Sequence, residues 1–109
     1  MQIGIDIVEV SRIAKLIKNK AFLKRVFTDQ EILYCAAKKN MAQHFAVRFA
    51  AKEAVYKALG QAGLALTDIG VKNLPSGKPE VCISGKRRAA IAISLTHTDS
   101  YAAAVALKK

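Results

Sequence analysis

Residues 48–60 read RFAAKEAVYKALG, and this stretch decides the fold. It is rich in strong helix formers and predicts a long helix, which we place over residues 41–59. Gly60 follows directly and is well placed to end the helix in a left-handed cap. A long helix at the middle of a short chain predicts a domain in which the remaining segments pack around it.

The helix carries one acid, Glu53, among the cations Arg48, Lys52 and Lys57. Glu53 and Lys57 are four residues apart and share a face, so an ordinary surface ion pair is one interpretation. Arg48 and Lys52 form a second four-residue step on the neighbouring face. Three cations beside one acid repel one another unless an anion lies there, and a phosphate group would relieve that repulsion.

The chain begins with an alternating segment, residues 2–10 (QIGIDIVEV), which predicts a strand. Its isoleucines share one parity, so Asp6 points away from the face that carries them. Gly4 allows another segment to approach the strand closely. An amphipathic helix with a basic outer surface is expected over residues 11–26, with Ser11 at its start.

A further helix is predicted from the capping-box pattern TDQE at residues 28–31 and extends to about Ala37. Residues 60–68 read as a loop. Strands are expected at residues 68–73, 80–83, 90–96 and 101–107, with turns at 75–79 and 98–100. An N-terminal strand and helices packed on one antiparallel sheet give the class α+β, and residues 1–109 form a single domain.

The composition restricts the partners. The 109 residues contain 18 Lys and Arg against 8 Asp and Glu, a net charge of +10, which favours nucleic acid, an acidic membrane, an acidic protein or a phosphate-rich small molecule. No secretory signal and no apolar run long enough to cross a bilayer is seen, so a cytoplasmic location is expected. Cys35 and Cys82 lie far apart without a Cys/His cluster, which predicts reduced, partly buried thiols rather than a zinc site.

Asp6 is a second candidate acid, either a solvated residue at a strand edge or a metal ligand. With Glu53 it would supply two carboxylates to Mg²⁺, and substrate phosphates and water would complete the coordination. His97, at a strand end before a turn, is either a structural residue or one that binds phosphate or moves a proton. Residues 76–78 (SGK) resemble a fragment of an anion-binding turn, although a plain hairpin explains them. No catalytic role is expected for His44.

Five segments, taken in order, resemble the holo-acyl carrier protein synthases, the small bacterial type of phosphopantetheinyl transferase. They are GIDIVEVSR, FLKRVFTDQE, RFAAKEAVYKALG, SGKP and SLTHTDSYAAAVAL. The resemblance implies the 4′-phosphopantetheinyl transferase-like fold and transfer of 4′-phosphopantetheine from coenzyme A to a serine hydroxyl of apo-acyl carrier protein. It further implies a need for Mg²⁺, release of adenosine 3′,5′-bisphosphate, and a homotrimer with active sites between subunits. The segment between Gly85 and Ile93 is shorter than in many relatives, which leaves the length of the last helix open.

The resemblance also implies the roles of individual residues. Asp6 and Glu53 match the catalytic, metal-binding acids, and Lys57 matches the lysine near the transferred phosphate. The positions associated with coenzyme A are Arg48, Lys57, Ser76, Gly77, Lys78, Pro79 and His97. The first-helix surface that docks acyl carrier protein is matched by Arg12, Leu16 and Phe22. On this interpretation Glu53 holds the metal and its cationic neighbours hold phosphates.

The chemistry fits these residue types. Attack of a serine oxygen on the β-phosphate builds negative charge that Mg²⁺ can spread, and Lys57 can neutralise or protonate the departing oxygen. Glu53 is a candidate base for the serine, either directly or through a water on the metal. The basic first helix would attract an acidic carrier protein.

Two rival functions remain, a nucleic-acid-binding module and a basic oligomeric scaffold without catalysis. The net charge and the basic helix support the first. Against nucleic acid, the sequence contains no DNA or RNA motif, and against a scaffold, such a protein needs neither Asp6 nor Glu53. We expect neither nucleic acid nor membrane as a partner.

Overall fold

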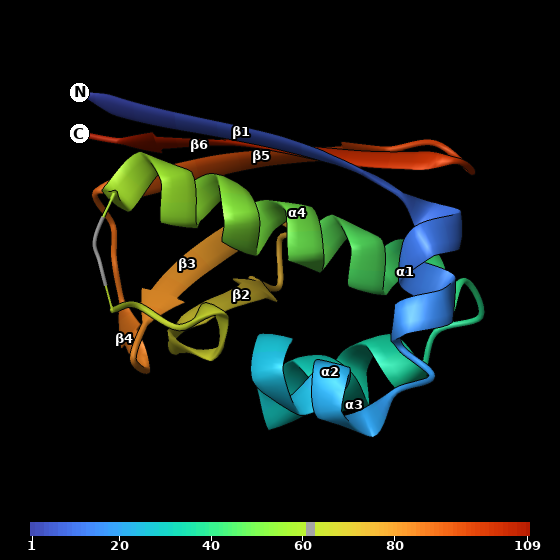
Figure 1. Ribbon diagram of the computed structural model, residues 1–109. Helices are drawn as coiled ribbons and strands as arrows, with labels where there is room; N and C mark the ends of the chain where they lie inside the picture. Colours follow the sequence, from blue (N-terminus) through green and yellow to red (C-terminus); the bar gives the residue numbers. More distant parts are fainter. Residues whose placement is uncertain (61–62) are drawn as a thin grey trace.

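Helix α4 (Met41–Leu59) forms the centre of the fold in the computed structural model, which describes residues 1–60 and 63–109. One antiparallel sheet, in the order β1-β6-β5, covers one side of the helix, and a second, in the order β2-β3-β4, lies on the other side (Figure 1). The strands are β1 (Gln2–Glu9), β2 (Ile69–Asn73), β3 (Pro79–Ile83), β4 (Lys86–Arg87), β5 (Ile91–His97) and β6 (Tyr101–Lys108). The α+β class is confirmed, but the strands form two sheets instead of the single sheet that the sequence predicted.

Helix α4 begins and ends at the predicted residues, and Gly60 closes it in the left-handed conformation with φ of 58°. The small side chains of its alanines allow other segments to pack closely, and β1 packs against the helix at Gly4. A Cβ atom on Gly4 would lie 2.0 Å from the carbonyl oxygen of Ala54 and 2.7 Å from the backbone nitrogen of Ala58. Only glycine permits this approach, which brings β1 directly against the helix.

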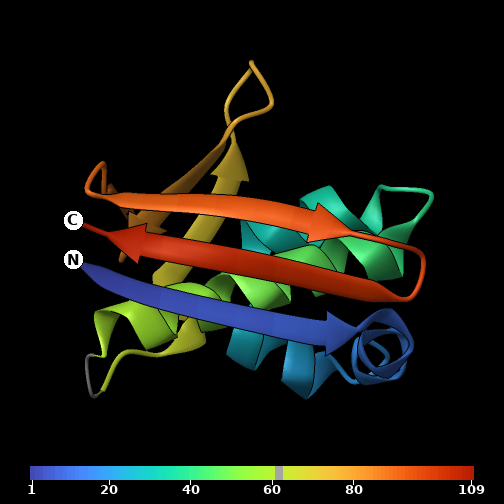
Figure 2. The same ribbon diagram turned by 90° about the horizontal axis from the view of Figure 1, so that it is seen from above.

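The isoleucines of β1 lie on the outer face of the first sheet. Ile3, Ile5 and Ile7 are 69%, 68% and 66% exposed. Their partners on β6 are Leu107, Val105 and Ala103, so the outer face is apolar across both strands. Seen from that side, no other element in the described part of the chain covers this sheet (Figure 2). The alternation places Asp6 on the face opposite the isoleucines, as the sequence predicted, and that face lies against α4.

The N-terminal helical region is two helices, α1 (Val10–Leu16) and α2 (Lys20–Val26), so the single helix expected over residues 11–26 is wrong. The side chain of Asn19 accepts hydrogen bonds from the backbone of Ala21 and Phe22 and thereby caps a new helix. Helix α1 also begins at Val10 and not after Ser11.

The third helix, α3 (Asp29–Ala36), begins as predicted. Thr28 N–H donates to Glu31 Oε1 at 2.9 Å and Glu31 N–H donates to Thr28 Oγ1 at 3.2 Å, which completes a capping box. A short 3₁₀ helix, η1 (Leu66–Asp68), lies inside the segment predicted as loop, of which residues 61 and 62 fall outside the described residues.

Residues 84–90 contain β4 and turns and no helix, which settles the question about a last helix. Cys35 and Cys82 are both free and are buried rather than partly buried. Burial raises the pKa of the Cys35 thiol to about 11, so this thiol is unreactive at neutral pH. Within residues 1–60 and 63–109, none of the helices has the length and apolar character needed to span a bilayer.

Candidate active site

Asp6 and Lys57 meet where β1 crosses α4. Lys57 Nζ lies 3.2 Å from Asp6 Oδ1 and donates a hydrogen bond of 3.0 Å to the carbonyl oxygen of Ile5. The Asp6 side chain is only 15% exposed, whereas that of Lys57 is 51% exposed. Lys57 therefore pairs across elements with Asp6, and the interpretation of Lys57 and Glu53 as a surface pair within one helix is wrong.

Glu53 lies close enough to Asp6 for the two charges to interact. Burial raises the pKa of the Glu53 carboxyl, and the negative charge of Asp6 raises it further. The cations Lys57 and Arg12 act in the opposite direction and lower this pKa. Two carboxylates and two cations thus share one neighbourhood, and a metal cation between the acids would relieve their repulsion.

The donor set fits Mg²⁺. Asp6 Oδ2 is buried and has no hydrogen-bond partner, which leaves one carboxylate oxygen available to a ligand. Among the described residues there is no group of three or more His, Cys, Asp or Glu side chains that could hold a metal ion. Mg²⁺ commonly takes one or two carboxylates and completes its octahedron with substrate phosphates and water, so Asp6 and Glu53 suffice.

Lys52 does not serve the role that its position in the helix suggested. Its side chain is fully buried, and Nζ lies 2.6 Å from Glu31 Oε1. It also donates to the carbonyl oxygens of Leu66 at 3.1 Å and Ile69 at 2.5 Å. Lys52 is therefore unavailable to a phosphate, and Glu31, predicted only as a capping residue, is the anion that neutralises it.

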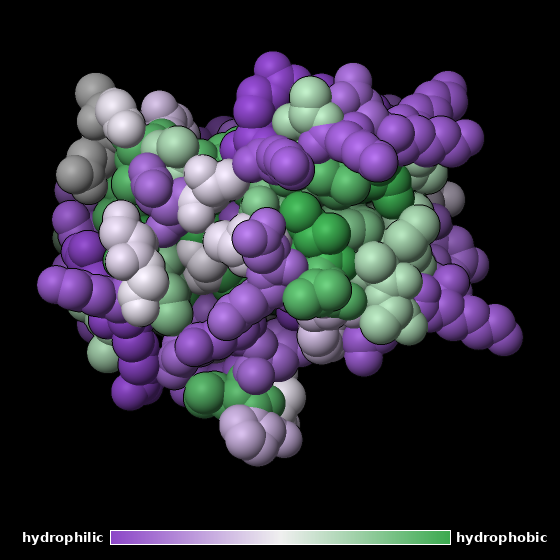
Figure 3. Space-filling view, turned by 90° about the horizontal axis from the view of Figure 1, so that it is seen from below, coloured by the Kyte–Doolittle hydropathy of each residue, from purple (hydrophilic) through white to green (hydrophobic). Residues whose placement is uncertain are grey.

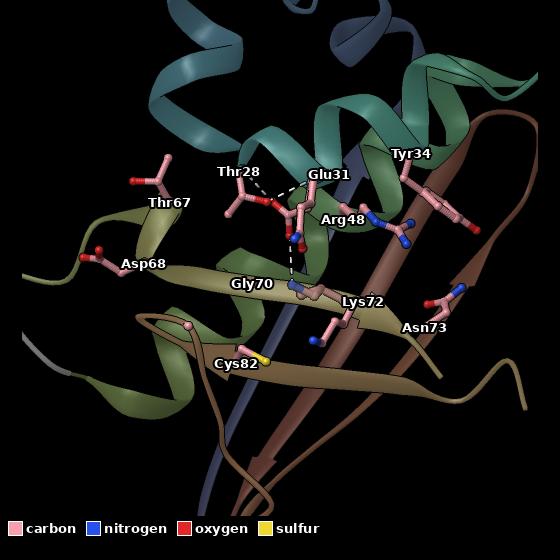
Figure 4. A pocket seen from close by; sticks show the side chains of 13 residues that line it. Thr28, Glu31, Tyr34, Arg48, Thr67, Asp68, Gly70, Lys72, Asn73 and Cys82 are labelled. Carbon is pink, nitrogen blue, oxygen red and sulfur yellow. Dashed lines mark hydrogen bonds between the residues drawn. The ribbon is translucent and has the colours of Figure 1, made fainter. Parts of the chain in front are cut away.

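Arg48 lies on the same side of α4 as Lys52 and lines a pocket of about 460 Å³ between α3, α4 and β2 (Figure 4). Arg48 is only 4% exposed, and its Nε has no hydrogen-bond partner. Its Cζ lies 4.3 Å from the centre of the Tyr34 ring, while Lys72 and Asn73 line the facing strand. A buried arginine with an unpartnered donor is suited to an anionic ligand. Nothing in the α3 sequence pointed to Tyr34.

The other residues assigned to the nucleotide lie at the edge of the fold away from β1. Ser76, Gly77 and Lys78 form the exposed tip of the β2–β3 hairpin, where Gly77 has φ of 88°, and Pro79 begins β3. The hairpin projects beyond β5, and β1 is the opposite strand of the first sheet (Figure 2). His97 is exposed at the end of β5.

The structure therefore separates the candidate residues into two sets and does not bring them into one site. Glu53 follows Arg48 by five residues, which turns its side chain about 140° around the helix. Asp6, Glu53 and Lys57 lie together beside β1 and are called the acid group. The other candidates, called the nucleotide group, lie away from β1: Arg48 beside α3 and β2, His97 at the end of β5, and the hairpin tip.

Arg12 is exposed on α1 and approaches the acid group, since its charge lowers the pKa of Glu53. Leu16 and Phe22 are half-buried against the core, and the Phe22 ring lies 6.1 Å from that of Phe49. Hydrophilic side chains surround a hydrophobic area on the face of the molecule beneath α2 and α3 (Figure 3). The exposed residues of α1, α2 and the connection between them include many cations, as predicted, namely Arg12, Lys15, Lys18, Lys20, Lys24 and Arg25. The two apolar candidates, Leu16 and Phe22, are partly used for packing.

Comparisons with known proteins agree with this fold. Residues 2–106 match the family model described as the 4′-phosphopantetheinyl transferase superfamily. A holo-[acyl-carrier-protein] synthase of Thermodesulfovibrio yellowstonii is 47% identical over 105 residues, which cover 94% of this chain and 92% of that protein. The crystal structure of the Helicobacter pylori synthase in complex with coenzyme A superposes with a TM-score of 0.84 at 31% identity, covering 98% of this chain and 99% of that one. The Bacillus anthracis synthase in complex with CoA (3′,5′-ADP) gives 0.83 at 32%, covering 96% and 92%.

Proposed function

The chain belongs to the 4′-phosphopantetheinyl transferase superfamily, and on that premise we propose its full reaction. It transfers 4′-phosphopantetheine from coenzyme A to a serine hydroxyl of apo-acyl carrier protein, the activity of a holo-[acyl-carrier-protein] synthase. We further propose that the reaction requires Mg²⁺ and releases adenosine 3′,5′-bisphosphate. One observation carries the proposal, the buried and unpartnered Oδ2 of Asp6 beside a second carboxylate, Glu53.

The residues of the acid group divide the chemical work. Asp6 and Glu53 would hold Mg²⁺, which when bound spreads the charge of the diphosphate. The half-exposed ammonium of Lys57 can neutralise the leaving phosphate as its negative charge grows. Glu53 is also a candidate base for the serine hydroxyl.

The second group would bind the nucleotide end of coenzyme A. Arg48 offers a buried, unpartnered N–H donor for a phosphate. The hairpin tip offers the exposed side chains of Ser76 and Lys78. His97, exposed at the end of β5, would contact the same part of the substrate. Arg12, Leu16 and Phe22 would dock the acidic carrier protein, mainly through the charge of Arg12.

A homotrimer with sites between subunits is supported by two features of the single chain. Its sheet leaves three isoleucines more than 60% exposed on one flat face, which is unusual unless another chain covers them. Asp6 and His97 lie on β1 and β5, the two edge strands of that sheet, so the acid group of one chain can face the nucleotide group of the next around a ring.

The test of the reaction is to incubate the protein with coenzyme A and apo-acyl carrier protein and to weigh the carrier protein by mass spectrometry. We expect a gain of one phosphopantetheine with Mg²⁺ and none with a chelator. Glu53→Gln should abolish the gain while the protein stays folded. The matched control is Glu80→Gln, which removes an acid of β3 paired with Arg87 at 2.8 Å and should leave the gain unchanged. A folded wild-type protein that leaves a competent carrier unmodified would contradict the proposal.

Shared sites can be tested by mixing two inactive variants, Glu53→Gln and Arg48→Ala, under conditions that exchange subunits. In a ring where each site takes one group from each of two neighbours, about a quarter of the sites in an equal random mixture are intact. We therefore expect about a quarter of the wild-type rate to return. A mixture that stays inactive after verified exchange would mean that each site lies within one chain.

A further inference from the structure

Strand β2 pairs with β3 along one edge, and its other edge is buried at the N-terminal end of the strand. Leu74 N–H donates to Lys78 O at 2.8 Å inside the β2–β3 hairpin, so residues 70, 72 and 74 form the hydrogen-bonded pairs with β3. By the alternation of antiparallel pairing, the backbone groups of Ile69 and Val71 point away from β3. Both residues are buried, and their polar backbone groups need partners.

The ion pair between Glu31 and Lys52 supplies those partners. Lys52 Nζ donates to the carbonyl oxygen of Ile69 at 2.5 Å, and Glu31 Oε2 accepts from Val71 N–H at 2.8 Å. The two side chains are joined at 2.6 Å and are 5% and 0% exposed. The two side chains thus take the place of the backbone donor and acceptor that a further strand would offer to β2. Glu31 extends from α3 toward β2 to do so (Figure 4).

The anchoring of β2 also affects the position of the hairpin tip. β2 is held by β3 on one side and by the Glu31–Lys52 pair on the other, whereas Ser76, Gly77 and Lys78 are exposed. At about 3.3 Å per residue the tip lies roughly 15 Å beyond Val71. A tilt of about 4° at the root would therefore displace the tip by about 1 Å, a shift large enough to impair a positioned binding group.

We propose that Glu31 and Lys52 are positioning residues for the coenzyme A site, acting through the hairpin. The pair fixes the direction in which β2 leaves the core, and so the place where residues 76–79 meet the nucleotide. This inference rests on the proposed function, which assigns the hairpin to coenzyme A. A buried ion pair often adds little net stability compared with apolar side chains. The direction of β2 is therefore a more informative property to test than the stability of the protein.

The decisive variant removes both charges together, Glu31→Gln with Lys52→Met, because either single change leaves a buried charge without its partner and endangers folding. We expect cooperative thermal unfolding, an apparent KM for coenzyme A raised about tenfold, and a KM for acyl carrier protein changed less than about twofold. Hydrogen exchange of the hairpin amides, measured by mass spectrometry without substrates, should accelerate about tenfold.

The matched control is Glu80→Gln with Arg87→Met, which removes an ion pair between β3 and β4 of the same sheet, in which Arg87 is 66% exposed. It should change neither the KM for coenzyme A nor the hairpin exchange. Wild-type exchange in the Glu31/Lys52 double variant would overturn the anchoring of β2. Faster exchange with an unchanged KM for coenzyme A would overturn the positioning role and place the failure in the assignment of the hairpin to that substrate. Equal increases in both KM values would show general loosening and overturn the proposal.

Discussion

Replacing Gly4 by alanine tests whether the close approach of β1 to α4 builds the acid group. A Cβ atom on residue 4 would lie 2.0 Å from the carbonyl oxygen of Ala54, where ordinary contact begins at 3.4 Å. Strand and helix would have to separate by about 1.4 Å (3.4 − 2.0) at this point, since the clash is with backbone and no flexible side chain can yield.

The separation should lower both stability and activity. Overpacking of this kind typically costs about 1–3 kcal/mol, and each kcal/mol lowers the Tm of a domain of this size by about 4–8 °C. Asp6 lies two residues along the same face of the strand and moves with it, so its 3.2 Å contact with Lys57 is lost. A displacement of about 1 Å in a catalytic group can cost about 100-fold in rate, and we expect a loss of that order.

The assay pairs calorimetry with the rate of Mg²⁺-dependent carrier modification, both at one fixed chain concentration because oligomerisation affects the Tm. Gly70→Ala is the stability control, since its Cβ would meet the Cβ of Cys82 at an ordinary 3.7 Å. A Gly4→Ala protein with wild-type Tm and rate would refute the reasoning. A lowered Tm with an unchanged rate would show that the contact serves packing and does not position Asp6.

Three further outcomes are expected. Because burial and Asp6 raise the pKa of Glu53, the folded state binds this proton more tightly than the unfolded state, and the stabilisation from the neutral carboxyl is lost as pH rises through the folded pKa. In metal-free protein, Glu53→Gln should therefore raise the Tm near pH 7.5, with no difference below about pH 4, as calorimetry across this range would test. Ile5→Asp should leave the chain folded but break the trimer in light scattering, and an intact trimer would contradict the proposed interface. Arg12→Glu should raise the KM for acyl carrier protein far more than that for coenzyme A, and equal effects would contradict docking by this residue.

Local patterns predicted the elements whose ends are set by local chemistry. Helix α4 ends at Gly60, and α3 begins at a capping box, because a cap is made by residues within a few positions of one another. The error over residues 11–26 has the same origin. Asn19 fits the polar face of an amphipathic helix as well as it fits a cap, and only the packing of α1 and α2 decides between the two.

The acid group was predictable because the alternation in residues 2–10 and the four-residue spacing of Glu53 and Lys57 agreed with the family resemblance. Asp6 faces α4 as its parity required, and Gly4 allows the approach that places it beside Lys57. The partner of Lys52 was not predictable, because Glu31 lies on another helix and its role in the cap already accounted for it. Pairing over such a distance along the chain depends on tertiary packing, which no local pattern encodes.

The four charged residues of α4 therefore have separate explanations, although they occupy ten consecutive positions. Glu53 and Lys57 join Asp6 on the side of β1, and Lys52 is neutralised by Glu31 on the side of β2. Among the described residues, Arg48 has no carboxylate within ion-pair distance. The repulsion inferred from the helix alone is thus relieved partly by acids from β1 and α3, and the part left for a bound phosphate falls on Arg48 and the half-exposed Lys57. Arg48 and Lys57 lie on different sides of the helix. On the proposed function, Arg48 binds the nucleotide end of coenzyme A and Lys57 the transferred phosphate, so sites shared between neighbouring chains are the simplest way for one molecule of coenzyme A to reach both.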